Sequence, residues 1–290
     1  MHNSPNLERI CSTIKNSIDD ELDRVGFYFR SFSRVKTSDS VRHKISTKGD
    51  GYYNEQKRIQ DIIGIRIILY YPDDIEIVCK HLKTRFRLDN ETIDANEATK
   101  FAPRRVNLVF KIPSNHEKEF NDQTQTGFLD TTFEVQIRTI LSEGWHEIDH
   151  DLRYKCKDDW TQSDDLERSF NGILATLETS EYALIRLFEQ LSYRHYKTKD
   201  IEAIIRTKFR LRIINKQITE DFKEKITEDF IKQVFKCDRA DLIDLLIKTD
   251  LYFPLTIENI VFFMNYFIIK NETILEETPS ELVYIFCKRK

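Results

Sequence analysis

The apolar positions of the chain follow a helical period at its start. From residue 6 to about residue 32 they recur every three to four residues, with Leu7, Ile14 and Leu22 on one stripe. This spacing predicts an amphipathic helix that packs one face against the rest of the protein.

Three segments in the first half are instead β-rich or alternate between apolar and polar residues. Pro72 and the acids beside it predict the start of a helix after the first of these segments. The polar stretch 88–100 predicts a loop. The predicted strands are residues 62–71, 106–113 and 131–139.

Beyond Ile140 the pattern is almost entirely helical. We therefore expect an α+β domain, with a sheet flanked by helices, over residues 1–195 and an all-helical region over residues 196–290. The predicted helices of the second half cover residues 140–156, 164–193, 199–217, 219–236, 239–248 and 256–269.

Charge and glycine content narrow the ways in which this chain could bind a nucleotide. With 45 basic and 49 acidic residues, it has no global positive charge that would draw it to nucleic acid, which leaves only a local basic patch. It has 7 glycines, where average usage of about 7% would give about 20. Neither GxGxxG nor GxxxxGK[ST] can be assembled from them, so any nucleotide must be held by side chains.

The cysteines and the apolar runs indicate in which cellular compartment the protein is expected. The five cysteines are scattered and never form CxxC, which argues against a disulfide framework and a zinc ribbon. The N-terminal residues carry charges throughout and lack the apolar core of a signal peptide. The best apolar run, residues 260–269, is too short to span a bilayer. We expect a cytoplasmic protein without a membrane segment.

Two carboxylates stand in strand contexts. Asp61 precedes the first predicted strand, and Glu134 lies within the third. Carboxylates on adjacent strands can hold Mg²⁺ against nucleotide phosphates, whereas an ion pair with a nearby arginine is the structural alternative for each. Gln136 and Arg138 share the face of Glu134 by the period of two, as they would on a solvated strand.

A basic stretch precedes the first carboxylate. Arg34, Lys36, Ser40 and Lys44 are spaced by two, four and four residues, so a helix from about residue 37 would place Ser40 and Lys44 on one face. Cationic side chains aligned in this way can grip a triphosphate without a glycine loop. A solvated basic helix is the alternative.

Residues 146–150 read His-Glu-Ile-Asp-His, which is a literal HExxH. In zinc peptidases two histidines one helical turn apart bind the metal, and the glutamate acts as the base. Here Asp149 places a charge where such helices are normally packed, and no GxxH follows. A zinc peptidase therefore stays only as a remote alternative.

Taken together, these motifs resemble the synthetase domain of the RelA/SpoT family, the alarmone synthetases that transfer pyrophosphate from ATP to a ribose 3′-hydroxyl. The resemblance implies a nucleotidyltransferase-like mixed sheet flanked by helices. It runs from about residue 34 to residue 155 and rests on R-x-K-x-x-x-S-x-x-x-K at 34–44, DIIGIRI at 61–67, DDI at 73–75, EVQIRT at 134–139 and W-x-x-x-D-H-D-x-x-Y-K at 145–155.

The resemblance also implies roles for individual residues. Asp61 would coordinate Mg²⁺, and Glu134 would share the metal or activate the attacking hydroxyl. Gln136 and Arg138 would complete the catalytic set on the acceptor or phosphate side, and His150 would orient its helix or contact phosphate. The residues implied for ATP binding are Arg34, Lys36, Ser40, Lys44, Lys48 and Arg66.

The acceptor loop departs from the family pattern. Where the family has G-Y-x-S-L-H, this chain has Ala102-Pro103-Arg104-Arg105-Val106-Asn107, so the tyrosine that stacks on guanine is absent. Stacking of a base on an aromatic ring contributes about 1–3 kcal/mol, and we expect the affinity for free GDP to fall by about one or two decades. Arg104, Arg105 and Asn107 are the candidate acceptor contacts, with exposed loop charges as the alternative for the arginines.

The resemblance predicts an ATP-dependent pyrophosphokinase with GDP or GTP as the default acceptor. The 3′ end of tRNA or another nucleotide, as used by toxic members of the family, is the alternative acceptor. A degenerate domain that binds nucleotide without turnover is the alternative function. We expect the helices beyond residue 195 to bury their apolar faces in their own core, or to bind a second copy of the chain or a regulatory or antitoxin protein.

Overall fold

The computed structural model describes residues 5–49, 52–54, 57–93, 106–123, 129–215 and 217–288. Contacts group the chain into two compact units. The first comprises Met1–Asp20 and Phe29–Thr179, and the second comprises Glu21–Tyr28 and Ser180–Lys290. Within the described ranges, no helix is long and apolar enough to cross a membrane.

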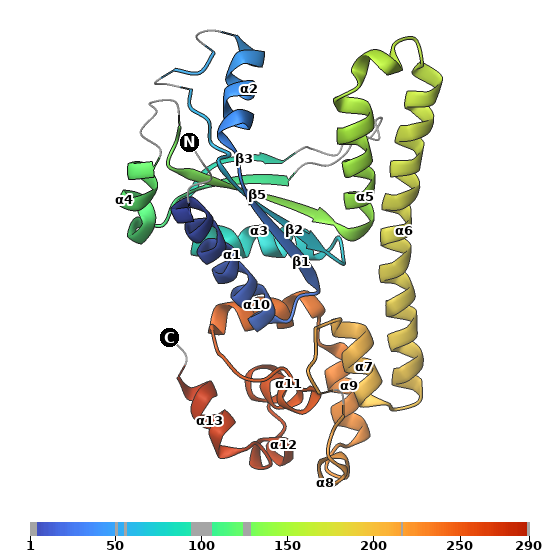
Figure 1. The fold of residues 1–290 in the computed structure, drawn as a ribbon. Coiled ribbons are helices and arrows are strands. Elements are labelled where there is room, and N and C mark those ends of the chain that lie inside the picture. The colour runs from blue at the N-terminus through green and yellow to red at the C-terminus, as the bar shows by residue number, and fades with distance from the viewer. Residues whose placement is uncertain are drawn as a thin grey trace. The chain divides into compact units, whose positions relative to one another are not determined.

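The first unit contains a five-stranded mixed sheet with the order β1-β2-β5-β4-β3 (Figure 1). Among the described strands, β2 and β5 pair in parallel and the other neighbours pair antiparallel. The sheet and its helices confirm the expected α+β class. The strands are β1 (Phe29–Val35), β2 (Ile63–Leu69), β3 (Leu88–Ile93), β4 (Val106–Lys111) and β5 (Thr132–Thr139).

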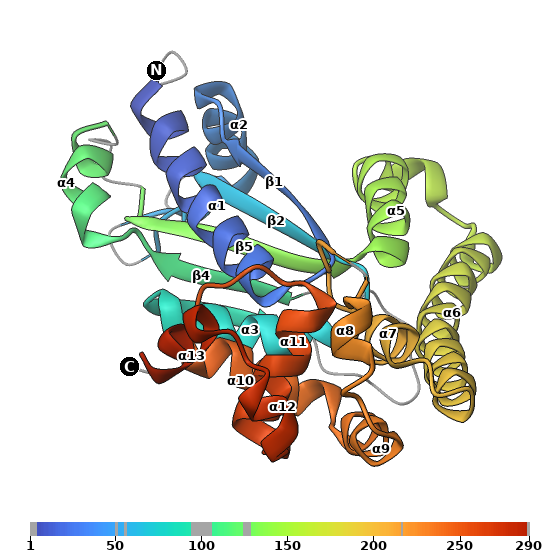
Figure 2. The ribbon, with the colours of Figure 1, turned by 90° about the horizontal axis from the view of Figure 1, so that it is seen from below.

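Helices cover the two faces of this sheet differently. In Figures 1 and 2, α1 and α3 lie along one face, whereas α2 and α5 stand on the other side. The helices that contribute to the first unit are α1 (Pro5–Val25), α2 (Ser38–Lys48), α3 (Asp74–Arg85), α4 (Ser114–Gln123), α5 (Ile140–Ile148) with its π-helical extension η1 (Asp149–Tyr154), the 3₁₀ turn η2 (Lys157–Trp160) and the start of α6 (Asp164–Lys197).

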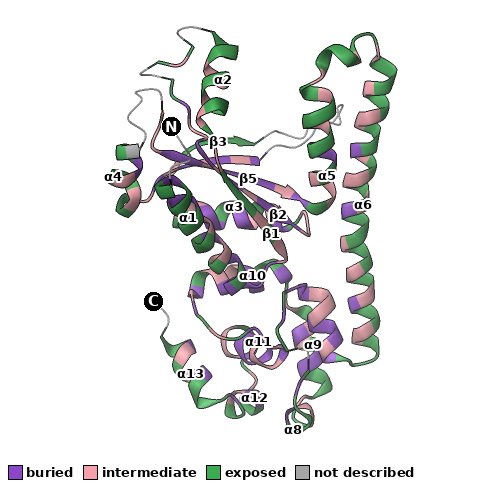
Figure 3. Cartoon of the chain, in the orientation of Figure 1, coloured by how far each residue is buried: buried purple, intermediate pink, exposed green. Residues whose placement is uncertain are grey.

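Burial alternates along the central strands, as their sequences require. In β5, Phe133, Val135 and Ile137 are buried, while the residues between them are half-exposed (Figure 3). β2 and β4 repeat this alternation over most of their lengths. One face of the sheet therefore forms the core, and the opposite face presents the polar side chains.

Two predictions were wrong at residues that form strands in the structure. The first helix does not continue to residue 32: it ends at Val25, where Gly26 adopts a φ of +86°, and the chain then enters β1. Part of the predicted loop 88–100 is the edge strand β3, whose residues are nearly all exposed. A strand at the edge of a sheet buries little, so it lacks the apolar pattern that marks a central strand.

The second unit is helical, as expected. The predicted helix 199–217 ends early, because Arg210 takes a left-handed conformation with a φ of 49°. The predicted helix 219–236 is two helices. Beyond the end of α6, the helices are α7 (Ile201–Ile204), η3 (Ile205–Phe209), α8 (Glu220–Lys223), α9 (Glu228–Lys236), α10 (Arg239–Thr249), α11 (Ile257–Met264), η4 (Asn265–Ile269), α12 (Glu272–Glu276) and α13 (Ser280–Cys287).

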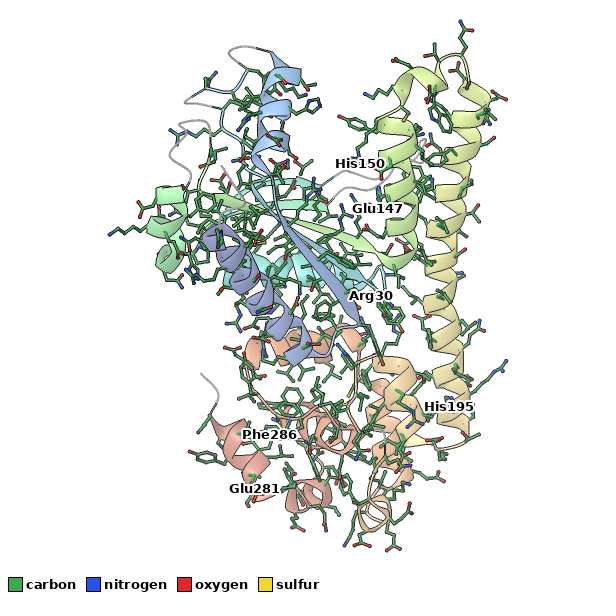
Figure 4. The ribbon with its side chains drawn as sticks, viewed as in Figure 1. Arg30, Glu147, His150, His195, Glu281 and Phe286 are labelled. Carbon is green, nitrogen blue, oxygen red and sulfur yellow. The ribbon has the colours of Figure 1, made fainter. Side chains whose placement is uncertain are left out.

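Aromatic side chains and one buried arginine hold the second unit together. Phe263 and Phe286 are buried with their ring centroids 5.7 Å apart (Figure 4 labels Phe286). Arg24 is almost fully buried, donates to the Leu246 carbonyl oxygen at 2.9 Å and pairs with Asp250 at 3.3 Å. The end of α1 is thus fixed by charge and by hydrogen bonds as well as by packing.

Substitution of Gly26 tests how the first helix ends. A Cβ there would lie 2.7 Å from Leu255 Cδ1, and the positive φ disfavours any L side chain. We expect Gly26→Ala to lower the free energy of unfolding by about 1–3 kcal/mol, measured by urea denaturation. Gly144→Ala, in helix α5 with nothing within 4 Å of the added Cβ, is the control and should stabilise by about 0.5–1 kcal/mol. Equal effects would contradict this account.

Candidate functional site

The open face of the sheet brings the predicted strand residues into two adjacent rows. Strand register places Gly64 between Arg34 and Glu134 in one row. In the next row, Arg66 lies beside Gln136. Paired residues on neighbouring strands point to the same face, about 5 Å apart, so residues that are distant in sequence share one surface.

Asp61 lies just before β2 and joins two lysines from different elements. Lys44 of α2 donates to both Asp61 carboxylate oxygens, at 2.9 and 2.8 Å, and Lys36, just after β1, also contacts this carboxylate. Lys36 is close to Asp61 because its N–H bonds the Ile62 carbonyl oxygen at 2.9 Å, which continues the pairing of β1 with β2. The predicted Lys36, Lys44 and Asp61 therefore form one half-buried cluster.

The three charges shift one another's pKa values. Burial acts to raise the pKa of Asp61, but the hydrogen bonds from Lys36 and Lys44 outweigh it and the net shift is downward. Burial lowers the pKa of Lys36 in spite of its contact with Asp61, whereas the pKa of Lys44 is raised because Asp61 outweighs burial there. Asp61 stays ionised at neutral pH, and Lys36 is the more easily deprotonated of the two lysines.

Glu134 lies near this cluster with a different electrostatic balance. Burial and the negative charge of Asp61 raise its pKa, against a hydrogen bond that Gln136 Nε2 donates to Glu134 Oε2 at 3.1 Å. Two carboxylates close enough to interact in this way form a site for a divalent cation or a proton. Of the two, Glu134 is the one suited to accept a proton.

Acids of α5 hold the arginines of the open face. Glu143 accepts from Arg66 at 2.7 Å and from Arg138 at 2.9 Å, one carboxylate oxygen for each. Glu147 also contacts Arg66. Thr139 caps α5 by accepting from the Ser142 N–H, which fixes where the helix starts after β5. The arginines are therefore positioned before any ligand binds.

The remaining predicted ATP contacts lie on β1 and α2. The Arg34 side chain passes over Gly64, with its Cγ 3.7 Å from where a Cβ would be. Ser40 is exposed in the first turn of α2, where its backbone N–H donates to Thr37 Oγ1 at 3.3 Å. Lys48 lies at the far end of α2, with its Nζ 5.4 Å from the centroid of the Tyr52 ring. Ser40 and Lys48 are thus on the same short helix as Lys44.

The predicted acceptor residues divide into three groups. Asn107 extends the second row, since it pairs with Gln136 across β4 and β5. His150 lies on η1, where its Nδ1 is 2.9 Å from Asp151 Oδ1. Figure 4 shows it one turn farther from the sheet than Glu147. Arg104 and Arg105 are outside the described residues, as are Ala102 and Pro103.

The geometry of the HExxH segment does not favour a zinc site. His146 is buried beside Trp145, whereas His150 is exposed and pairs with Asp151. The α-helix gives way to a π-helix at Asp149, so the two histidines are not on consecutive turns of one regular helix. Glu147, which would be the base, contacts Arg66. Among the residues described, no cluster of three or more metal-ligating side chains was found.

Sequence reasoning missed three residues of this surface. Glu143 and Glu147 could have been found only from their spacing on α5 opposite the arginines. Phe32 pairs with Arg66 in the register of β1 and β2 and is 56% exposed. Ser33, the next residue, hydrogen-bonds Cys11 of α1 on the core face, so Phe32 points to the open face, where an exposed aromatic ring is available for stacking.

Comparison with known proteins assigns a class to this segment. Residues 33–159 match the family model described as the region found in RelA / SpoT proteins. That segment includes the lysine–aspartate cluster, α5 and most of the open sheet face, though not Phe32. The resemblance inferred from the motifs is therefore confirmed over this part of the chain.

Individual relatives match a part of the chain that is similar in length. The chain is 32% identical over 124 residues to GTP pyrophosphokinase YjbM of Bacillus subtilis (strain 168), and 26% identical over 133 residues to GTP pyrophosphokinase YwaC of the same organism. These matches cover 42% and 44% of this chain, and 54% and 59% of the two relatives. The chain thus spans little more than half the length of the curated relatives that it matches.

Solved structures of this class resemble the chain at lower identity. The small alarmone synthetase 1 from Bacillus subtilis bound to its product pppGpp has a TM-score of 0.49 at 20% identity, covering 64% of this chain and 95% of that one. A GTP pyrophosphokinase family protein from Streptococcus pneumoniae has a TM-score of 0.48 at 20% identity, covering 62% of this chain and 87% of that one.

The raised pKa of Glu134 gives a stability prediction for the metal-free protein. The folded pKa exceeds the unfolded one, so ionised Glu134 destabilises the fold above the folded pKa, and the penalty vanishes as the pH falls through the ordinary value near 4.5. We expect Glu134→Gln to stabilise the protein at pH 7 by about 1 kcal/mol, measured by urea denaturation with EDTA present, and to have no effect below pH 4.

The exposed Glu117 on α4 offers a matched control. Glu117→Gln makes the same chemical change away from Asp61, in the first turn of α4, where loss of the charge should not stabilise the protein at pH 7. A Glu134→Gln variant that is less stable than the parent at pH 7 would contradict the assigned electrostatics.

Proposed function

We propose that the chain is an ATP-dependent pyrophosphokinase of the alarmone synthetase type, with a guanosine nucleotide as its default acceptor. The observation that supports this most is the position of Asp61, held by Lys36 and Lys44 close to Glu134. It combines cations for a polyphosphate with two carboxylates for a metal ion and a proton. Side chains alone supply these groups, as the scarcity of glycine requires.

The proposed reaction joins the acceptor 3′-oxygen to the β-phosphorus of ATP. The bond from that phosphorus to the oxygen bridging the α-phosphate breaks, and AMP leaves. Glu134, with its raised pKa, accepts the proton of the attacking hydroxyl. Arg34, Lys36 and Lys44 bind the donor phosphates, and Arg138 neutralises charge on the transferred group.

The carboxylate pair suits Mg²⁺. Asp61 and Glu134 repel each other enough to shift a pKa, and a shared cation would relieve this repulsion. They would hold Mg²⁺, whose charge offsets that of the transferred phosphates. The lysines that now contact Asp61 would then donate to phosphate oxygens.

Fewer described residues of the open face indicate the acceptor than indicate the ATP donor. Asn107 beside Gln136 offers polar contacts, while Arg104 and Arg105 add charge in the sequence of the acceptor loop. A guanosine nucleotide is the default, and the 3′ end of tRNA is the alternative acceptor. A degenerate domain that binds nucleotide without turnover is the alternative function.

Pyrophosphate transfer tests the proposed activity. With γ-labelled ATP offered together with GDP, GTP or tRNA, label should enter one acceptor as AMP is released. Because each removes a carboxylate that binds metal or proton, Asp61→Asn and Glu134→Gln should each reduce the rate by about 10²–10⁴-fold. Asp39→Asn, an exposed carboxylate on α2, is the control and should keep the rate. Intact ATP binding without transfer to any acceptor would favour the degenerate domain.

Phe32 is proposed to contact the adenine of ATP, since it pairs with Arg66 on the open face and is exposed. Loss of a stacked ring should raise the KM for ATP about tenfold and leave kcat unchanged. Steady-state kinetics of Phe32→Ala measure this, and Phe32→Tyr should restore the KM. An unchanged KM in Phe32→Ala would exclude this contact.

A further inference from the structure

Two acids of helix α5 contact the same pair of arginines on the open face, and they differ in exposure. Glu143 accepts from Arg66 at 2.7 Å and from Arg138 at 2.9 Å. Glu147, one helical turn later, contacts Arg66 and lies 3.6 Å from Arg138 (Figure 4 labels Glu147). The side chain of Glu143 is 14% exposed and that of Glu147 is 49% exposed. Glu143 is therefore the enclosed member of the pair, and Glu147 is the member that faces solvent.

A single oxygen atom of Glu147 reaches both guanidinium groups. Both contacts are made by Glu147 Oε1, and the contacting atom is Nη1 in Arg66 as well as in Arg138. Because one oxygen is within ion-pair distance of both nitrogens, the two guanidinium groups are close enough to bind one oxyanion together. Glu147 Oε1 thus marks a position where an oxygen atom is attracted by two positive charges.

Both arginines keep further donors for a ligand. A guanidinium has five N–H donors, and the hydrogen bonds to the two acids all leave from Nη1. Within the described ranges, no residue accepts a hydrogen bond from Nε or Nη2 of Arg66 or Arg138. Both side chains are half-buried rather than enclosed. A phosphate group has several acceptor oxygens, so it can satisfy more of these donors than the one oxygen of Glu147 can.

The charges of this cluster balance while Glu147 keeps its contacts. Two arginines then face two carboxylates, and the cluster has little net attraction for an anion. If Glu147 turns away, one net positive charge remains, and Glu143 still holds both arginines. An exposed ion pair is weak because water and salt screen it. An incoming phosphate can therefore displace Glu147 by moving only one side chain.

We propose that Arg66 and Arg138 form a phosphate-binding site for which Glu147 competes with the ligand. Glu143 stays in place and fixes the two guanidinium groups, whereas Glu147 leaves when a phosphate group of a nucleotide binds. Glu147 thus lowers the apparent affinity for that ligand, because only the molecules in which it has turned away can bind. This inference rests on the proposed function for the identity of the ligand as a nucleotide.

Nucleotide binding to the full chain, measured by isothermal titration calorimetry, tests this competition. The α,β-methylene analogue of ATP with Mg²⁺ represents the donor, and GDP with Mg²⁺, titrated separately, represents the acceptor. We expect Glu147→Gln to tighten the binding of at least one of them about 3–10-fold, because it removes the competing charge. The nucleotide that shows the gain is the one whose phosphate binds there. Unchanged or weaker binding of both nucleotides would overturn the proposal.

Asp151 provides a matched control in the same stretch of chain. It lies four residues after Glu147, is exposed, and pairs with Lys155 and His150 rather than with the arginines. Asp151→Asn also removes one negative charge, but it should change either Kd by less than about twofold. An equal gain in Asp151→Asn would show a general charge effect and would overturn the competition.

Removal of Arg66 locates the effect. Arg66→Gln takes away a guanidinium that both acids contact, so adding Glu147→Gln to that variant should tighten binding by no more than about twofold. A gain that persists would overturn the proposal. None of these measurements requires turnover. A chain that shows the gain but transfers no pyrophosphate keeps this inference and loses the proposed activity, whereas a chain that transfers pyrophosphate without the gain loses this inference alone.

Discussion

The parallel pairing of β2 with β5 is the interaction on which the candidate site depends. It places Gly64 opposite Glu134 and Arg66 opposite Gln136. Because side chains alternate between faces, a slip of one residue would turn Glu134 into the core and a buried valine out to solvent. The apolar residues of the core face thus fix the strand register. The same register brings the polar residues of the opposite face together, so core packing also determines the geometry of the candidate site.

Within that frame, four cations of the surface are each held by a carboxylate. Asp61 orients two lysines, and Glu143 orients Arg66 and Arg138. Such pairs limit the cost of partly burying charge before a ligand arrives. A phosphate can then replace the carboxylate as acceptor without reorganising the cation. Glu134 differs, since burial and the negative charge of Asp61 raise its pKa, and this makes it the carboxylate better suited to take up a proton.

The sequence predicted the parts of this unit that bury apolar residues. β2, β4 and β5 are central strands with apolar runs, and their approximate positions were predicted from sequence alone. β1 was missed because its residues are mostly exposed or half-buried, and because the helical period before it gives no sign of the turn at Gly26. The edge strand β3 was missed for the same lack of burial.

For the candidate site, the sequence motifs predicted which residues form the basic cluster. They did not predict the contacts between elements that lie far apart in the chain. Lys36, Lys44 and Asp61 lie within 26 residues of one another, and the family resemblance assigned all three to one nucleotide site. The bridge from Glu143 to two arginines depends on where α5 lies against the sheet, which no spacing in the sequence specifies. In the sequence Phe32 looks like any other apolar residue. The register of β1 against β2 shows that it lies on the open face.

The row from Phe32 to Asn107 also bears on the choice of acceptor. Phe32, Arg66, Gln136 and Asn107 lie on four consecutive strands, so the row is about 14 Å long at the usual strand spacing. Under the proposed function, its aromatic end stacks the donor base, while the described residues at its other end offer the Asn107 amide and, on β3, the hydroxyl of Thr92. An acceptor held there by polar side chains would be selected through its phosphates or through a larger surface, which favours highly charged acceptors over a free nucleoside.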